Sequence, residues 1–174
     1  LYFSNAGSFS PDELMPSDFA QDALVRMGLG VVEQLKNSQR LFLKTQVSDS
    51  SINYAYDLSS DMVNRIAPPS IHVMIKELAS PIFESLAGAK ISQNYNVIVF
   101  VVTKGTNYEN AYRHGLNIMG DVFDELYTNT GLLGTTDSLI SFNAELDTRK
   151  DSDDVVCVHR LDLQYMRRID MRHR

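Results

Sequence analysis

The longest apolar stretch of the chain is short and lies near its middle. Residues 97–102 read VIVFVV, inside a segment from 95 to 103 that is apolar at nearly every position. A run of this length, rich in β-branched residues, predicts a central strand covered on both faces. It is far shorter than the roughly 18–20 residues that a membrane-spanning helix needs. We therefore expect a fold organised around one sheet, without membrane insertion.

The length and composition are those of one ordinary domain. With 174 residues, of which 44% are hydrophobic and 22% charged, the chain is large enough for a single core. We expect one domain over residues 17–170, after a flexible lead-in over 7–16 and before a basic tail over 171–174. Residues 1–6, LYFSNA, resemble the remnant of a cleavable expression tag. A single cysteine excludes an internal disulfide and predicts folding in a reducing, cytosolic compartment.

The charge is unevenly distributed along the chain. The 22 acidic and 16 basic side chains give a net charge of −6, which disfavours tight binding to nucleic-acid phosphates. The segment from Arg160 to Arg174, in contrast, contains five arginines and only two acidic residues, Asp162 and Asp170. We interpret this segment as a basic tip on an acidic body. Such a tip either is solvated or docks on the acidic body of a neighbouring copy.

Periodicity predicts the elements of the first half. Apolar residues spaced three and four apart predict a helix over residues 17–36. Alternation of smaller apolar residues and threonine with polar or larger residues predicts a strand over 41–47, and a similar alternation predicts one over 71–75. Between them, the polar segment 48–69 is either a functional loop or a loop around one short helix. Residues 79–90, which lack clear periodicity, resemble an excursion between strands.

The second half has the clearest pattern. Thr106-Asn107-Tyr108-Glu109 has the form of a capping box, and a wide apolar stripe follows at helical spacing toward Gly131. Strands are predicted over 139–147 and 155–170, joined by a charged turn. One face of the last strand carries mainly apolar side chains, namely Val155, Cys157, His159, Leu161, Leu163 and Tyr165.

These elements predict an α+β fold in the order α-β-β-β-α-β-β. We expect a mostly antiparallel sheet of about five strands with two main helices packed on one face. Two helices cannot cover both faces of such a sheet. Much of the second face should therefore be open to solvent or to another subunit.

Residues with catalytic potential are few. Cys157 and His159 share one face of a strand, about 6.6–7 Å apart along it, which is a spacing that lets a thiol and an imidazole communicate. Both continue an apolar alternation, however, and a lone cysteine usually packs as a small hydrophobe. We expect core packing, and keep a small cysteine-dependent hydrolase as an alternative function.

No cofactor or metal is expected. No histidine stands at metal-ligand spacing, and Asp151, Asp153 and Asp154 lack the glycine and glutamate of a calcium loop. The glycines match neither the GxGxxG nor the GxxxxGK(S/T) phosphate-binding motif. Tyr108, Tyr112 and Tyr127 are interpreted as core and rim residues rather than as a stacking platform for nucleic-acid bases.

The remaining candidates concern assembly rather than chemistry. The apolar residues of the 79–90 excursion either cover the core or reach onto another chain, and the terminal arginines are candidates for docking. The candidate interface residues are Ile82, Phe83, Leu86, Arg160, Arg167, Arg168 and Arg172.

Four segments together resemble a known family: 68–73 (PPSIHV), 95–102 (YNVIVFVV), the capped helix 107–126 with Ala111 and Gly115, and the closing strand 156–169. In this order they resemble the tail-terminator, or tail-completion, proteins of long-tailed phages and prophages, including lambda-like and Mu-like members. The resemblance covers about residues 17–170, and segments 48–69 and 79–90 depart from the family's pattern.

The resemblance implies a structural subunit without a catalytic site, a cofactor or a metal. Family members assemble as a ring, typically a hexamer, that caps the tail tube and joins it to the head. The implied partners are other copies of the chain, the tail-tube protein and the head-completion protein, with DNA only as passing cargo. The implied location is the bacterial host cytoplasm during assembly and then the tail or neck of the virion. A bacterial binding module that uses an open sheet face is a further alternative.

Overall fold

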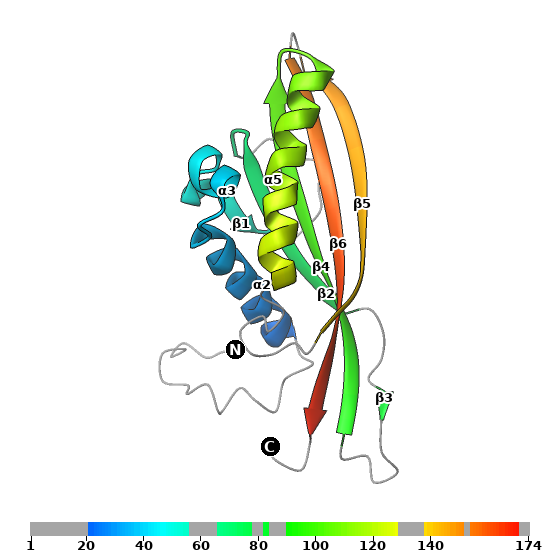
Figure 1. Cartoon of the computed structure of the whole chain (residues 1–174). Helices are drawn as coiled ribbons and strands as arrows, with labels where there is room; N and C mark the ends of the chain where they lie inside the picture. The colour runs from blue at the N-terminus through cyan, green and yellow to red at the C-terminus, as the bar shows by residue number, and fades with distance from the viewer. Residues whose placement is uncertain are drawn as a thin grey trace.

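The computed structural model describes residues 21–55, 66–77, 82–83, 90–128, 138–151 and 154–170. In chain order the elements are α2 (Gln21–Lys36), α3 (Leu41–Gln46), the 3-10 helix η3 (Asp49–Ser51), β1 (Ile52–Tyr54), β2 (Ser70–Glu77), β3 (Ile82–Phe83), β4 (Lys90–Gly105), α5 (Tyr108–Thr128), β5 (Ser138–Asp151) and β6 (Asp154–Asp170). Figure 1 shows α2, α3 and α5 on one side of a twisted sheet.

The sheet has six strands in the order β1-β2-β4-β6-β5, and β3 pairs with β4 outside this path. All pairs are antiparallel except β1 with β2, which run parallel. The α+β class, with its helices on one face, is therefore confirmed. The sheet differs from the expected one because it is mixed and contains two strands, β1 and β3, that the sequence pattern did not reveal.

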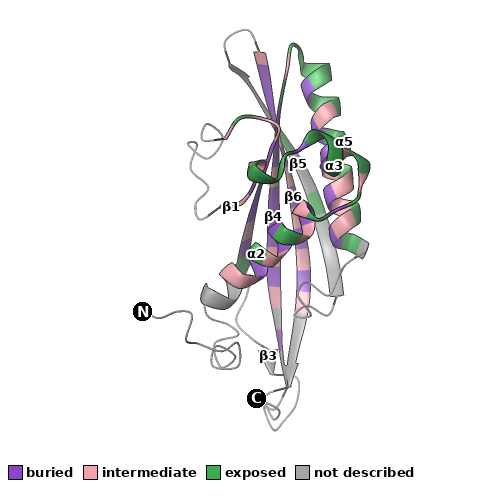
Figure 2. Cartoon of the chain, turned by 90° about the vertical axis from the view of Figure 1, so that its left-hand side faces the viewer, coloured by how far each residue is buried: buried purple, intermediate pink, exposed green. Residues whose placement is uncertain are grey.

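The core lies between the helices and one face of the sheet. On β6, all six side chains that were predicted to share a face are at most 4% exposed. They meet Tyr95, Val97, Val99 and Val101 of β4 and the inner residues of α2 and α5, as the burial pattern in Figure 2 illustrates. The hydroxyl of Tyr165 donates a 3.0 Å hydrogen bond to the carbonyl of Leu126, so this buried polar group is paired.

The segment 41–47 is a helix, and the predicted strand is wrong. Leu43 and Val47 are buried and stand four residues apart, whereas Leu41 is 65% exposed, so burial follows a helical period. The first amides of α3 are bound from a distant element. The carboxylate of Asp121 on α5 accepts hydrogen bonds from the amide nitrogens of Phe42 at 2.7 Å and Leu43 at 3.4 Å. This long-range cap satisfies donors that a helix leaves unpaired at its start.

The cap of α5 lies one residue later than predicted. Asn107, rather than Thr106, accepts the hydrogen bond from the amide of Asn110, at 2.9 Å. Glu109 forms a 2.9 Å ion pair with Arg113 one turn on instead of the reciprocal bond of a capping box.

The segment 48–69 contains more regular structure than expected. Its described part holds η3 and β1, and Tyr54 of β1 packs where a side chain at Gly28 of α2 would overlap it. Gly28 therefore permits close packing of α2 on the sheet edge. The Pro68-Pro69 peptide bond is cis.

The second face of the sheet is less open than expected. Ile98 and Val102 of β4 and His72 of β2 point away from the helices, yet each is at most 3% exposed. The burial of Ile98 and Val102 confirms that β4 is covered on both faces. Phe100, Arg160 and Asp162 on the same face are half-buried.

Candidate assembly interface

The topology brings two parts of the predicted interface to one end of the sheet. In the strand register Ser92 of β4 pairs with Ile82 of β3 on one side and with Arg168 of β6 on the other. Phe83 and Arg167 lie next to them in their strands. Figure 1 shows that this end of β4 and β6 projects beyond the helices. Leu86 and Arg172 lie outside the described residues.

Arg160 is held within the sheet. Its Nε donates a 2.9 Å hydrogen bond to Oδ1 of Asp162, and the side chains are 35% and 21% exposed. The guanidinium carbon lies 5.7 Å from the centroid of the Phe100 ring on the neighbouring strand, within cation–π range. Among the arginines that we predicted as docking residues, Arg160 therefore already has partners in its own chain.

Cys157 and His159 lie under α5, and their expected core packing is confirmed. Cys157 is fully buried and His159 is 2% exposed. The His159 ring lies against Gly115, where any side chain would overlap it. Among the described residues, neither ring nitrogen of His159 has a hydrogen-bond partner.

Burial sets the protonation of both groups. It raises the pKa of the Cys157 thiol and lowers the pKa of the His159 imidazole, because each charged form loses its hydration. At neutral pH the pair is therefore a protonated thiol and an uncharged imidazole. This is the opposite of the thiolate and imidazolium that an activated nucleophile needs.

Within the part of the chain that the structure covers, no three His, Cys, Asp or Glu side chains gather as a metal site. None of the described helices combines the length and the apolar character needed to cross a bilayer.

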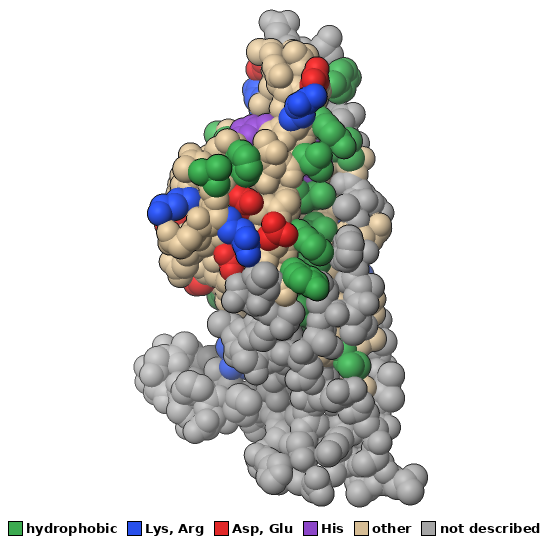
Figure 3. Space-filling view, in the orientation of Figure 1, with side chains coloured by type: hydrophobic (Ala, Val, Ile, Leu, Met, Phe, Trp, Pro, Cys, Tyr) green, Lys and Arg blue, Asp and Glu red, His purple; other side chains and the backbone are tan. Residues whose placement is uncertain are grey.

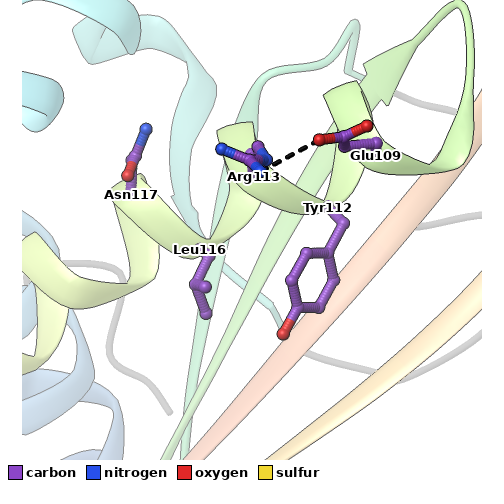
Figure 4. A pocket seen from close by; sticks show the side chains of 5 residues that line it. All are labelled: Glu109, Tyr112, Arg113, Leu116 and Asn117. Carbon is purple, nitrogen blue, oxygen red and sulfur yellow. Dashed lines mark ion pairs between the residues drawn. The ribbon is translucent and has the colours of Figure 1, made fainter.

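The surface of α5 carries an open hollow of about 510 Å³, lined by Glu109, Tyr112, Arg113, Leu116 and Asn117. All five residues come from one helix. Figure 4 shows Tyr112 and Leu116 on one side of the helix and Arg113 and Asn117 on the other. The described lining residues therefore do not converge from several elements, as the groups of a small-ligand site do.

The most distinctive exposed feature is an apolar line along α5, which we call the α5 stripe: Tyr108, Tyr112, Leu116, Phe123 and Tyr127. Four of its members are 40–58% exposed, and the half-buried Phe123 stacks on Tyr127 with 5.6 Å between ring centroids. Figure 3 shows apolar side chains in a continuous band along this side of the molecule. Of the interpretation of the three tyrosines as core and rim residues, the core part is wrong, because all three are at least 40% exposed.

The sequence did contain a signal for the α5 stripe. The sheet buries only one line of the helix, formed by Ala111, Gly115, Ile118, Val122 and Leu126. A helix with a second apolar line beside that one is wider in its apolar face than a single sheet contact requires. The width of the pattern thus predicts a second contact.

Comparison with known proteins bears on the fold. No protein-family model matches the sequence, and no curated protein matches it. Among solved structures, a chain of the virion of a native gene transfer agent particle is similar, with a TM-score of 0.50 and 12% sequence identity. The match covers 85% of this chain and 98% of that chain. At this identity the similarity establishes a shared fold over nearly the whole length of the neighbour.

Proposed function

We propose that this chain is a structural subunit of a phage-like virion, and within that class a tail terminator. In this role it assembles as a ring, typically of six copies, that caps the tail tube and joins it to the head. The single observation that carries the proposal is the fold shared with almost all of a chain from a virion particle. The sequence resemblance to tail-terminator proteins supports the finer role independently.

The surface chemistry supports an assembly role. A subunit that must bind its neighbours needs exposed apolar area outside its own core, and the α5 stripe provides such area. The net charge of −6 suits a channel through which DNA slides, because an acidic wall does not hold phosphates.

The alternative of a cysteine-dependent hydrolase has little support. Cys157 is fully buried beneath α5 and has a raised thiol pKa. A substrate would have to displace the helix to reach it. The alternative of a binding module on an open sheet face loses support because Ile98, Val102 and His72 are buried on that face.

Tail-tube assembly tests the proposal directly. Tubes are polymerised from the tail-tube protein encoded in the same phage or prophage, with and without the purified chain, and viewed by negative-stain electron microscopy. We expect the chain to form a ring at one end of each tube and to stop its elongation. Tubes of unchanged length with bare ends would contradict the tail-terminator role.

A further inference from the structure

The α5 stripe lies on the side of α5 that faces away from the other helices. α3 reaches α5 through Asp121, whose carboxylate binds the amide of Phe42. At 100° per residue, positions 112, 116, 123 and 127 fall on the opposite side of the helix from position 121. Figure 1 shows that β5 is the strand on that side, whereas α2 and α3 lie on the other.

The edge of the sheet beside the α5 stripe is also uncovered. Leu146 of β5 pairs with His159 of β6 and therefore shares the helix-facing side, yet it is 45% exposed. In the described sheet no strand pairs with the outer edge of β5. The α5 stripe and Leu146 together form one apolar strip at the end of the helix layer.

The size of this strip matches a binding surface. A large side chain covers roughly 150–250 Å², so the exposed fractions of Tyr108, Tyr112, Leu116, Tyr127 and Leu146 amount to about 360–600 Å². The largest apolar patch on an ordinary monomer is about 300–600 Å² and is often functional. A stable interface buries about 800 Å² per partner, so the strip supplies roughly half to three-quarters of one.

The helices α2 and α3, on the other side of α5 from β5, carry further exposed apolar residues. Outside the strip, the large apolar side chains exposed among the described residues are Leu29 of α2, at 45%, and Leu41 of α3, at 65%. Figure 3 shows charged and polar side chains between the α3 region and the band along α5. One molecule thus presents the strip on one side of its helix layer, and Leu29 and Leu41, on two separate helices, on the other side.

We propose that a second copy of this chain occupies the strip, with its Leu29 and Leu41 surface packed against the α5 stripe and Leu146. This inference rests on the proposed ring function, which requires a head-to-tail contact between two different surfaces. A contact of stripe on stripe would leave Leu29 and Leu41 in water and would stop at a dimer. The head-to-tail contact buries both surfaces and repeats from copy to copy until the ring closes.

Two charge substitutions with matched controls test the inference. Leu116→Glu places a carboxylate in the strip, and Asn117→Glu places one on the exposed neighbouring position that points away from it. Leu41→Glu places a carboxylate in the Leu29 and Leu41 surface, and Gln46→Glu is its exposed control on the same helix. None of the four positions is buried, so thermal unfolding followed by circular dichroism should stay near that of the wild type.

Assembly is then followed in two ways. The mass of the species in solution is measured at protein concentrations up to about 1 mM, and rings on tube ends are viewed by electron microscopy. We expect ring species for the wild type and both controls, and monomers for Leu116→Glu and for Leu41→Glu. A 1:1 mixture of the two monomeric variants should give heterodimers, because each retains the surface that the other has lost. Mixing is the sharpest test, because copies that met stripe on stripe would not form these heterodimers.

Three outcomes would overturn the inference: a wild type that stays monomeric in solution and on tubes, a Leu116→Glu variant that assembles normally, or a Leu41→Glu variant that does. The tube assay separates these from failure of the proposed function. Wild-type protein that caps tubes through other surfaces refutes the inference alone. Self-association through the two surfaces without tube capping refutes the tail-terminator role alone.

Discussion

The imidazole of His159 on β6 packs against the phenol ring of Tyr112 on α5, with 5.5 Å between ring centroids and 43° between ring planes. The backbone of Gly115 on α5 also lies against the His159 ring, where an added Cβ would overlap it. An uncharged imidazole without hydrogen-bond partners thus sits where the longest helix meets the sheet. At this contact the packing of α5 is therefore sensitive to the size and to the charge of the His159 ring.

Acid should weaken the fold through His159. Burial lowers its pKa below the ordinary 6.5, so the unfolded chain takes up a proton at a higher pH than the folded chain does. The stabilising contribution of the uncharged ring is complete above about pH 6.5 and is lost as the pH falls below it. His72, also buried, has its pKa shifted in the same direction and adds to the effect. We therefore expect the urea concentration at the midpoint of unfolding to decrease as the pH is lowered from 7 to 5.

A variant isolates the part due to His159. His159→Leu fills a similar volume without a titrating group, so it should reduce the pH dependence between pH 7 and pH 5. At pH 7 it should leave the free energy of unfolding unchanged or raise it by up to about 2 kcal/mol, because the unpaired ring nitrogens are removed. His114→Gln on α5, which is not buried, serves as the control. An unaltered pH profile in His159→Leu would exclude this ring as the sensor.

A methyl group at Gly115 should loosen α5. The new Cβ would overlap the His159 ring and lie 2.9 Å from Oγ1 of Thr103, so Gly115→Ala should destabilise the fold by about 1–3 kcal/mol. Gly120 on the same helix has no atom within 4 Å of the equivalent Cβ position. Gly120→Ala should therefore stabilise the helix by up to about 1 kcal/mol. Thermal unfolding of the two variants should shift in opposite directions, and a common shift would refute the close contact at Gly115.

Removal of the distant cap should destabilise α3. Asp121→Ala deprives the amides of Phe42 and Leu43 of their acceptor, and we expect a loss of about 1–2 kcal/mol in the free energy of unfolding. The matched control is Glu33→Ala, which removes an exposed carboxylate whose nearest partner is Lys36 at 3.9 Å. Exposed pairs of this kind contribute about 0–1 kcal/mol. Equal effects of the two substitutions in urea unfolding would argue against the cap.

The long strands and their faces were predictable because their signal is local. On β6, alternate residues from Val155 to Tyr165 assign a buried face by the two-residue period alone, and the hairpin to β5 fixes the pairing. α3 was not predicted in this way, because LFLKTQV has no strict alternation of apolar and polar residues, and the first amides of the helix are bound by Asp121, some 80 residues later in the chain. Propensity over six residues gives way to such a tertiary contact.

The candidate interface was only partly predictable for a related reason. The sequence marks every apolar position of α5 but does not state which of them the sheet covers. That depends on the rotation of the helix, which Gly115 and His159 fix by close packing. The terminal arginines were selected by charge alone, and for Arg160 the strand register supplies Asp162 and Phe100 as partners.

The single thiol should report on the global stability of the fold. Cys157 is fully buried, and its raised pKa keeps it protonated at pH 7. Iodoacetamide attacks the thiolate, so labelling should require unfolding and should be slower than for the urea-unfolded chain by at least about 10³-fold, as expected for a stability of several kcal/mol. Gly115→Ala should speed the labelling and Gly120→Ala should slow it, because each changes the population of the open state. A native thiol that reacts as fast as the unfolded one, at an unchanged circular dichroism spectrum, would instead mean that α5 opens without unfolding, and the hydrolase alternative would regain an accessible nucleophile.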